Sequence, residues 1–291
     1  MLKGSFVALV TPFKNNEIDY TALEALIDFH LENKTDGILF CGTTGESPSL
    51  AGDEKERLVR FGVKKIAGRV PVMVGTGSNN LNHTLAATAK AKDWGADYAL
   101  VITPYYNKPT QTGMYQYFSE IARRSALPIV IYNVPGRTGV NMSAATTIKL
   151  AEEFANIVAT KEASGDLVQV SEIVKAAPPG FSVLSGEDAL NLAYLSCGAQ
   201  GTVSVTANIL PRQVHDLIQF ALQGEYQAAL KIHQELLEIN QKMFIETNPI
   251  PVKRALYKMG KIAAELRLPL CELEPENKEI LDASLRNYGL I

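Results

Sequence analysis

The sequence predicts a (β/α)8 barrel, also called a TIM barrel, followed by a helical C-terminal extension. Eight short apolar runs rich in β-branched residues recur along the chain, and successive runs begin 20 to 33 residues apart. Each run precedes a longer stretch of helical periodicity, as parallel strands require, because their connections must cross back over the sheet. We therefore expect a catalytic barrel over residues 1–223 and a helical region over residues 224–291.

The predicted strands are almost continuously apolar, which is typical of parallel strands that are buried on both faces. They are residues 6–10, 37–40, 70–74, 98–102, 128–132, 157–161, 181–184 and 201–205. The strands of a doubly wound open sheet have the same character, so that fold is the alternative. The count of eight favours the closed barrel.

The segments between the strands carry helix signals, the first of which is Asp19 ahead of an apolar stripe that reaches Leu31. The remaining predicted helices of the barrel are residues 53–66, 82–94, 115–125, 143–154, 168–177, 188–196 and 211–222. After Gly224 the strand signal disappears, and three more helices are predicted over residues 225–246, 251–260 and 276–288. This region has no strand partner, so we expect it to pack on the barrel or on a neighbouring subunit.

The composition is that of an ordinary globular protein. Of the 291 residues, 46% are hydrophobic and 20% are charged, which excludes a disordered, collagen-like or coiled-coil chain. The net charge of −3 gives no basis for binding nucleic acid or an anionic membrane surface. No apolar window approaches the roughly 20 residues of a membrane span, so we expect a soluble protein without nucleic-acid or membrane partners.

The cysteines and histidines lack the spacing of metal or redox sites. The cysteines are Cys41, Cys197 and Cys271, and the histidines, on predicted helices away from the strand ends, are His30, His83, His215 and His233. We therefore expect no metal. The short apolar run near the N-terminus lacks the features of a signal peptide, and the sparse cysteines suit a reducing cytoplasm.

The functional groups of such a barrel lie at the C-terminal ends of its strands, and Lys161 ends the sixth predicted strand. Burial disfavours the ammonium form of a lysine, and a neutral amine is the nucleophile that forms a Schiff base with a carbonyl substrate. From position alone, the alternative is a side chain that extends to solvent or pairs with Glu162.

The loop Gly42-Thr43-Thr44-Gly45 follows the second predicted strand. Its backbone N–H groups and two hydroxyls suit a small carboxylate, although an ordinary strand-to-helix turn is the alternative. It is not a P-loop, because no Gly-Lys-Ser/Thr follows. The sequence Gly75-Thr76-Gly77 is not a dinucleotide fingerprint, because Asn80 stands at the third glycine position.

Three further side chains near strand ends could act on a substrate. The hydroxyls of Tyr106 and Tyr132 could relay protons, and Arg137, in a Pro-Gly-Arg-Thr-Gly turn, could bind a substrate carboxylate. The alternatives are aromatic packing at the barrel rim for the tyrosines and a surface position without a specific role for the arginine.

Several of these motifs together resemble the dihydrodipicolinate synthase family, also called the 4-hydroxy-tetrahydrodipicolinate synthase family. The resemblance covers essentially the whole chain. Its motifs, in the same order and spacing, are residues 42–46, 101–106, 132–139, 157–163, 184–188, 203–208 and 248–253.

The resemblance implies a Schiff-base condensation in the biosynthesis of diaminopimelate and lysine. Lys161 would condense with pyruvate, and the resulting enamine would attack the aldehyde of L-aspartate 4-semialdehyde before cyclisation. The lysine amine would serve in place of a cofactor. The resemblance also implies a homotetramer built as a dimer of dimers.

The resemblance further assigns a role to each site residue. Thr43 would link Tyr132, the general acid/base, to Tyr106 of a neighbouring subunit in a proton relay. Thr44 and its backbone amide would bind the carboxylate of pyruvate, and Arg137 would bind that of the semialdehyde. The remaining pocket residues would be Gly186 and, through its carbonyl, Val203.

The wider superfamily leaves two alternatives open. It includes N-acetylneuraminate lyase and ketodeoxygluconate-type aldolases, which share the barrel and the Schiff-base lysine and differ in the second substrate. The other alternative is a catalytically silent binding protein on the same fold, because a fold does not fix a function.

Many members of the family bind L-lysine as an inhibitor between subunits. The Ser, Tyr and Asn of that pocket correspond to Ser47, Tyr105 and Asn79, so these match. Three other positions, two histidines and a glutamate in lysine-sensitive members, are Gly52, Lys55 and His83 here. A glycine offers no side-chain contact, and an ammonium and an imidazole weaken the binding of a cation. We therefore expect an enzyme that is insensitive to lysine.

Overall fold

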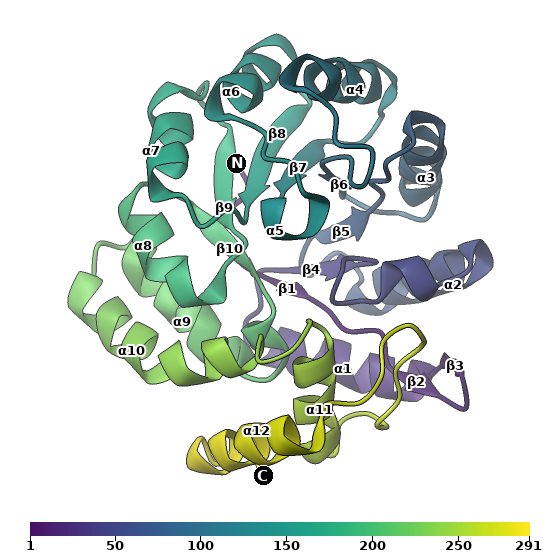
Figure 1. The fold of residues 1–291 in the computed structure, drawn as a ribbon, viewed down its shortest axis with the longest axis vertical. Helices are drawn as coiled ribbons and strands as arrows, with labels where there is room; N and C mark the ends of the chain where they lie inside the picture. The colour runs from purple at the N-terminus through teal and green to yellow at the C-terminus, as the bar shows by residue number, and fades with distance from the viewer.

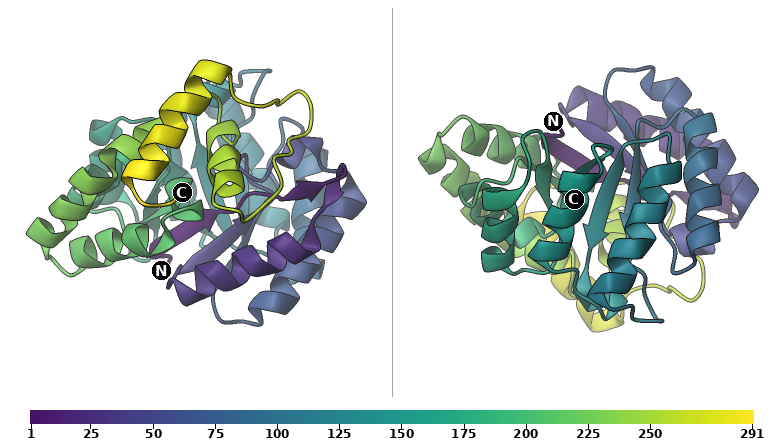
Figure 2. Two further views of the ribbon diagram at one scale, coloured as in Figure 1. Left: turned by 90° about the horizontal axis from the view of Figure 1, so that it is seen from below. Right: turned by 90° about the horizontal axis from the view of Figure 1, so that it is seen from above.

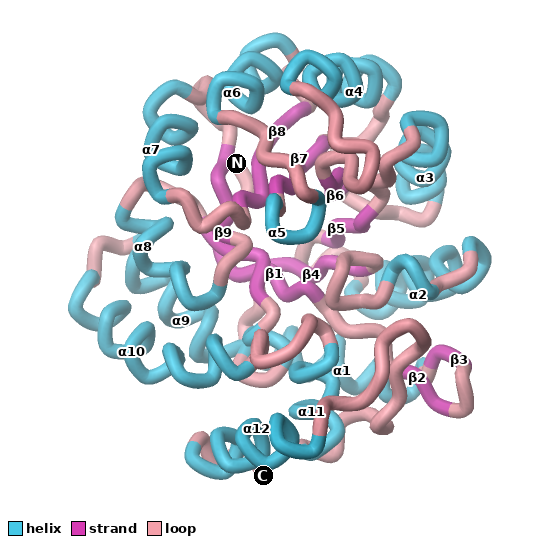
Figure 3. The backbone as a smooth tube through the Cα atoms, in the orientation of Figure 1, coloured by secondary structure: helices cyan, strands magenta, loops and turns pink.

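The computed structural model describes all residues from Met1 to Ile291, and its centre is a closed ring of eight parallel strands (Figure 1 and Figure 3). Around the ring the order is β1 (Gly4–Ala8), β10 (Gly201–Ser204), β9 (Ser182–Ser185), β8 (Ile157–Glu162), β7 (Ile129–Asn133), β6 (Tyr98–Ile102), β5 (Val72–Gly75) and β4 (Gly37–Phe40). Because β1 pairs with both β10 and β4, the sheet has no free edge. The predicted TIM barrel is confirmed, and the open sheet is excluded.

Eight helices cover the outside of the ring, as the alternating pattern predicts. They are α1 (Tyr20–Glu32), α2 (Gly52–Ile66), α3 (Leu81–Asp93), α4 (Gln111–Arg124), α6 (Ala144–Glu153), α7 (Leu167–Ala176), α8 (Asn191–Ser196) and α9 (Pro211–Leu222). Among these eight helices, the largest shift of a boundary is in α4, which begins at Gln111 rather than Tyr115. The hydroxyl of Thr110 caps this helix by accepting a hydrogen bond from the N–H of Gly113.

The strands bury both faces. One face packs against the surrounding helices, and the other fills the barrel with a separate cluster of side chains. That interior cluster includes Phe6, Leu39, Met73, Leu100, Val130, Tyr132, Ala159, Leu184 and Val203. A filled interior gives the strand ends a rigid support, which is what a site at those ends requires.

The C-terminal region consists of α10 (Tyr226–Lys242), α11 (Ile250–Lys258) and α12 (Pro275–Asn287). It packs on the barrel: α10 lies along α9, and α12 packs against both α10 and α11 (Figure 1 and Figure 2). The division at residues 223 and 224 stays a prediction, since one apolar core includes both Leu217 of α9 and Leu236 of α10.

Three short elements are not predicted by the sequence patterns. Two of them, β2 (Phe13–Lys14) and β3 (Glu17–Ile18), form an antiparallel pair, and the third is α5 (Pro135–Thr138), which lies in front of the strand ends in Figure 1. None of the helices combines the length and the hydropathy that a membrane span requires.

Candidate active site

Lys161 lies near the C-terminal end of β8 with its side chain in the barrel mouth. The residue is only 6% exposed, and Nζ lies 4.3 Å from the ring centroid of Tyr132 on the neighbouring strand β7. No carboxylate lies within ion-pair distance of Nζ. Lys161 therefore neither extends into solvent nor pairs with Glu162, so both alternatives raised by its position alone are excluded.

Glu162, the next residue and the last of β8, is fully buried and accepts hydrogen bonds from neutral donors only. Nδ2 of Asn133 lies 3.0 Å and 3.1 Å from its two oxygens, Nε2 of Gln169 lies at 3.2 Å, and the N–H of Ser164 lies at 3.0 Å. Burial raises the pKa of Glu162, and these hydrogen bonds oppose that rise. The network joins β7 to β8 and so fixes the strand end that carries Lys161.

The loop after β4 presents a row of free donors. The N–H groups from Gly42 to Gly45 make no hydrogen bond within the chain, and the Thr44 hydroxyl accepts one from Nδ2 of Asn248 at 3.0 Å. The loop is bounded by two residues in the left-handed region, Cys41 (φ 54°) and Glu46 (φ 51°). Successive unpaired N–H groups form a concave donor surface that suits a carboxylate.

A cavity of about 50 Å³ lies between this loop and Lys161. Six of the eight predicted site residues line it, namely Thr43, Thr44, Tyr132, Arg137, Lys161 and Gly186. The structure thus brings together an amine, a loop with free N–H donors, a phenol and a guanidinium at one strand-end pocket. Glu187, Phe244 and Asn248, for which the sequence predicts no role, are among the other residues that line it.

Gly186 is required by the close approach of the loop after β9 to Lys161. A Cβ atom at this position would lie 2.6 Å from Cβ of Ala163 and 3.0 Å from Cε of Lys161. The N–H of Gly186 also donates to the Glu162 carbonyl at 2.8 Å. Any larger residue would displace the lysine side chain or the loop.

The outer side of the cavity is charged. Arg137, on α5, donates from Nη2 to the Asn248 carbonyl at 3.2 Å. Burial raises the pKa of the Glu187 carboxyl, while the charges of Lys161 and Arg137 lower it. Glu187 and Asn248 lie within motifs that carry the family resemblance, and that was the only sequence signal for them.

Two predicted site residues do not line this cavity. Tyr106 is 90% exposed and makes no hydrogen bond with Thr43 or Tyr132, so a single chain does not assemble the predicted relay. Val203 belongs to the interior cluster, and Val205 lines the cavity instead. The end of β10 is held near the cavity because Oδ2 of Asp188 accepts a hydrogen bond from the N–H of Val205 at 2.7 Å.

A larger cavity of about 380 Å³ adjoins the site, and Thr43 and Tyr132 line both cavities. Of the positions aligned with the lysine pocket of the family, four line the larger cavity: Ser47, Lys55, His83 and Tyr105. The expectation that all four histidines lie away from the strand ends is wrong for His83, because α3 begins directly after the loop that follows β5. No group of three or more metal-ligating His, Cys, Asp or Glu side chains occurs in the structure.

Comparison with known proteins identifies the family. The family model of the Dihydrodipicolinate synthetase family matches residues 1–288. The chain belongs to this family. The family resemblance predicted from the sequence motifs is therefore confirmed.

Relatives within the dihydrodipicolinate synthetase family align over the full chain. A protein of Aquifex aeolicus named 4-hydroxy-tetrahydrodipicolinate synthase is 50% identical, over 100% of this chain and 99% of its own. The crystal structure of dihydrodipicolinate synthase from the same organism superposes with a TM-score of 0.97 at 50% identity, covering 99% of both chains. A dihydrodipicolinate synthase of Cyanidioschyzon merolae, described with lysine bound, has a TM-score of 0.96 at 40% identity and 99% coverage of both chains.

Proposed function

We propose that Lys161 is the Schiff-base nucleophile of a pyruvate-dependent condensation. The predicted activity, that of a 4-hydroxy-tetrahydrodipicolinate synthase and class I aldolase-type lyase, is confirmed by the family match and the named relatives. The assignment of this role to Lys161 depends on one observation above all. Its amine is buried, has no carboxylate partner, and shares a small cavity with an anion-binding loop.

The chemistry follows from the residues around that amine. The lysine nitrogen attacks the ketone carbon of pyruvate and water leaves, giving an imine whose methyl group loses a proton to form an enamine. The enamine carbon then attacks the aldehyde of L-aspartate 4-semialdehyde, after which the product cyclises. Tyr132 acts as the general acid/base, and its place beside Nζ supports this role.

Two sites bind the two carboxylates. The free N–H groups of Thr43 and Thr44, with the Thr44 hydroxyl, bind the carboxylate of pyruvate. Arg137 binds the carboxylate of the semialdehyde at the outer side of the cavity. Gly186 provides the space beside the lysine, and the Val203 carbonyl belongs to the pocket wall together with Val205.

The proposal extends to the assembly and the location of the enzyme. Tyr106 completes the proton relay from a neighbouring subunit, and its exposed position supports this assignment. The enzyme is then a homotetramer built as a dimer of dimers, works in the cytoplasm, and uses its own amine in place of a cofactor.

A panel of aldehydes tests the second substrate. The native enzyme is given pyruvate with L-aspartate 4-semialdehyde, N-acetylmannosamine or glyceraldehyde, and turnover is expected with the semialdehyde only. Arg137→Ala should lose roughly 2–4 kcal/mol of transition-state binding toward the semialdehyde and still condense with pyruvate. Turnover of either sugar aldehyde in place of the semialdehyde would assign the enzyme to another aldolase branch, and unchanged kinetics of the variant would refute the role of Arg137.

A further inference from the structure

A buried ion pair joins the C-terminal region to the carboxylate-binding loop. Nζ of Lys253, on α11, lies 2.5 Å from Oε1 of Glu46, which directly follows the free donors of Gly42 to Gly45. The two side chains are 2% and 1% exposed. Neither charge reaches solvent, so each depends on the other for compensation.

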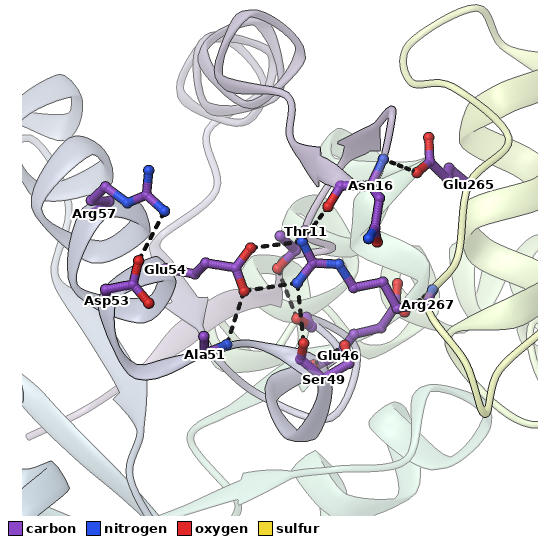
Figure 4. A network of polar contacts seen from close by, with 11 residues as sticks. Thr11, Asn16, Glu46, Ser49, Ala51, Asp53, Glu54, Arg57, Glu265 and Arg267 are labelled. Atoms are coloured by element: carbon purple, nitrogen blue, oxygen red, sulfur yellow. Dashed lines mark hydrogen bonds and ion pairs between the residues drawn. The ribbon is translucent and has the colours of Figure 1, made fainter.

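The second oxygen of the Glu46 carboxylate is bound from the same region. The N–H of Arg267 donates to Oε2 at 3.1 Å, and the Arg267 side chain extends past it to Glu54 of α2 (Figure 4). Lys253 and Arg267 also lie over the ring of Phe13, with Nζ and Cζ at 4.3 Å and 4.2 Å from its centroid. Both oxygens of Glu46 are therefore held by a segment more than 200 positions away in sequence.

The backbone at Glu46 requires such support. With φ 51° and ψ 37° the residue is left-handed, a conformation that costs free energy for any residue other than glycine and persists where the surroundings enforce it. The N–H of Glu46 donates to the Thr43 carbonyl at 3.0 Å, which closes the turn. The direction of the free N–H groups of Thr43 and Thr44 thus depends on where the Glu46 side chain is held.

Asn248 connects the same region to both substrate sites. Its Nδ2 donates to the Thr44 hydroxyl at 3.0 Å, and its carbonyl accepts a hydrogen bond from Arg137 at 3.2 Å. The segment from Asn248 to Arg267 therefore contacts the loop at three points, and none of its contacts reaches Lys161 through a hydrogen bond.

We infer that the Glu46–Lys253 ion pair is a positioning device that sets the carboxylate-binding loop for pyruvate. The inference rests on the proposed function, since it assigns that loop to the pyruvate carboxylate. Loss of the pair misplaces the donors and weakens the binding of pyruvate, while the amine of Lys161 stays in place. The expected signature is a raised KM for pyruvate with a largely retained kcat.

The test compares two double variants, each of which changes one residue of α11 and the carboxylate that this residue pairs with. K253M/E46Q removes both buried charges, so no charge is left uncompensated. R254M/D282N is the matched control, because Arg254 of α11 pairs with Asp282 of α12 at 2.7 Å and has no contact with the loop. We expect K253M/E46Q to raise the KM for pyruvate roughly tenfold to a hundredfold, the scale of an ångström-sized misplacement. The control should leave that KM unchanged.

The outcomes separate this inference from the proposed function. An unchanged pyruvate KM in K253M/E46Q, or an equal rise in the control, overturns the inference. If the native enzyme itself forms no borohydride-trapped adduct with pyruvate, the proposed function fails instead. Glu46→Asp serves where the double variant does not fold, because it keeps the charge and shortens its reach. It should raise the pyruvate KM, and an unchanged value there also overturns the inference.

Discussion

Two buried glutamates lie at opposite sides of the barrel mouth, Glu46 after β4 and Glu162 on β8, and their charges are compensated in different ways. Glu46 meets the ammonium of Lys253 from the C-terminal region. Glu162 meets the amides of Asn133 and Gln169 and the N–H of Ser164, all within the barrel.

The two kinds of compensation position two different parts of the site. Around Glu162 every donor is neutral, so burial raises the pKa of the carboxyl and the network serves to fix the strand that carries Lys161. Around Glu46 a full charge comes from a distant helix, which makes the loop depend on the C-terminal region. Lys161, the proposed nucleophile, is therefore positioned by the barrel alone, and the loop proposed to bind the pyruvate carboxylate is positioned by the barrel together with its extension.

The largest expected effect follows from removing the cation that compensates Glu46. Lys253→Met leaves a buried carboxylate without its cation and should lower the free energy of unfolding by about 3–5 kcal/mol. Arg254→Met, on the same helix, should cost less, because Arg254 and Asp282 are 20% and 12% exposed and Lys258 still pairs with Asp282 at 3.2 Å. Urea denaturation at neutral pH measures the free energy of unfolding of both variants. Equal losses would mean that the burial of the Glu46–Lys253 pair does not increase its contribution to stability.

A smaller effect is expected at Glu162. Glu162→Gln replaces one carboxylate oxygen by an NH2 group, which then faces N–H donors and cannot accept from them. This change should lower the free energy of unfolding by about 1–3 kcal/mol. The pKa of the native carboxyl is raised above its ordinary value of 4.5, so the folded state holds this proton more tightly than the unfolded state. The resulting stability is complete below pH 4.5 and is lost as the pH rises through the folded-state pKa.

Denaturation at a series of pH values tests this sign. Between pH 4.5 and pH 7 the free energy of unfolding of the native chain should fall relative to that of the Glu162→Gln variant. A difference that stays constant over this range, or grows in favour of the native chain, would show that Glu162 is ionised in the folded enzyme at little cost.

The surroundings of the two glutamates also show which features the sequence patterns can predict and which they cannot. The strands and Lys161 could be predicted because parallel strands are continuously apolar and end in polar residues at one face of the barrel. The Glu46–Lys253 pair could not, because a contact across 207 residues leaves no periodic signal. The elements β2, β3 and α5 have two to four residues each, too few to show a period.

The smallest expected effect lies at the far side of the Glu46 loop, where Ser47 borders the larger cavity with Lys55 and His83. An ammonium and an imidazole at these positions disfavour a cationic effector, so we expect no inhibition by L-lysine up to millimolar concentrations. The Cyanidioschyzon merolae relative, described with lysine bound, is the comparison enzyme for the same titration. Clear inhibition of this enzyme would mean that other residues form an effector site.

Borohydride trapping tests the central claim, that the barrel places the amine of Lys161 as the nucleophile. The native enzyme is treated with pyruvate and borohydride, and the adduct is located by peptide mass spectrometry. We expect one reduced pyruvyl group on Lys161 and none in Lys161→Ala. An adduct that persists in the variant, or that never forms on the native enzyme, would contradict the account.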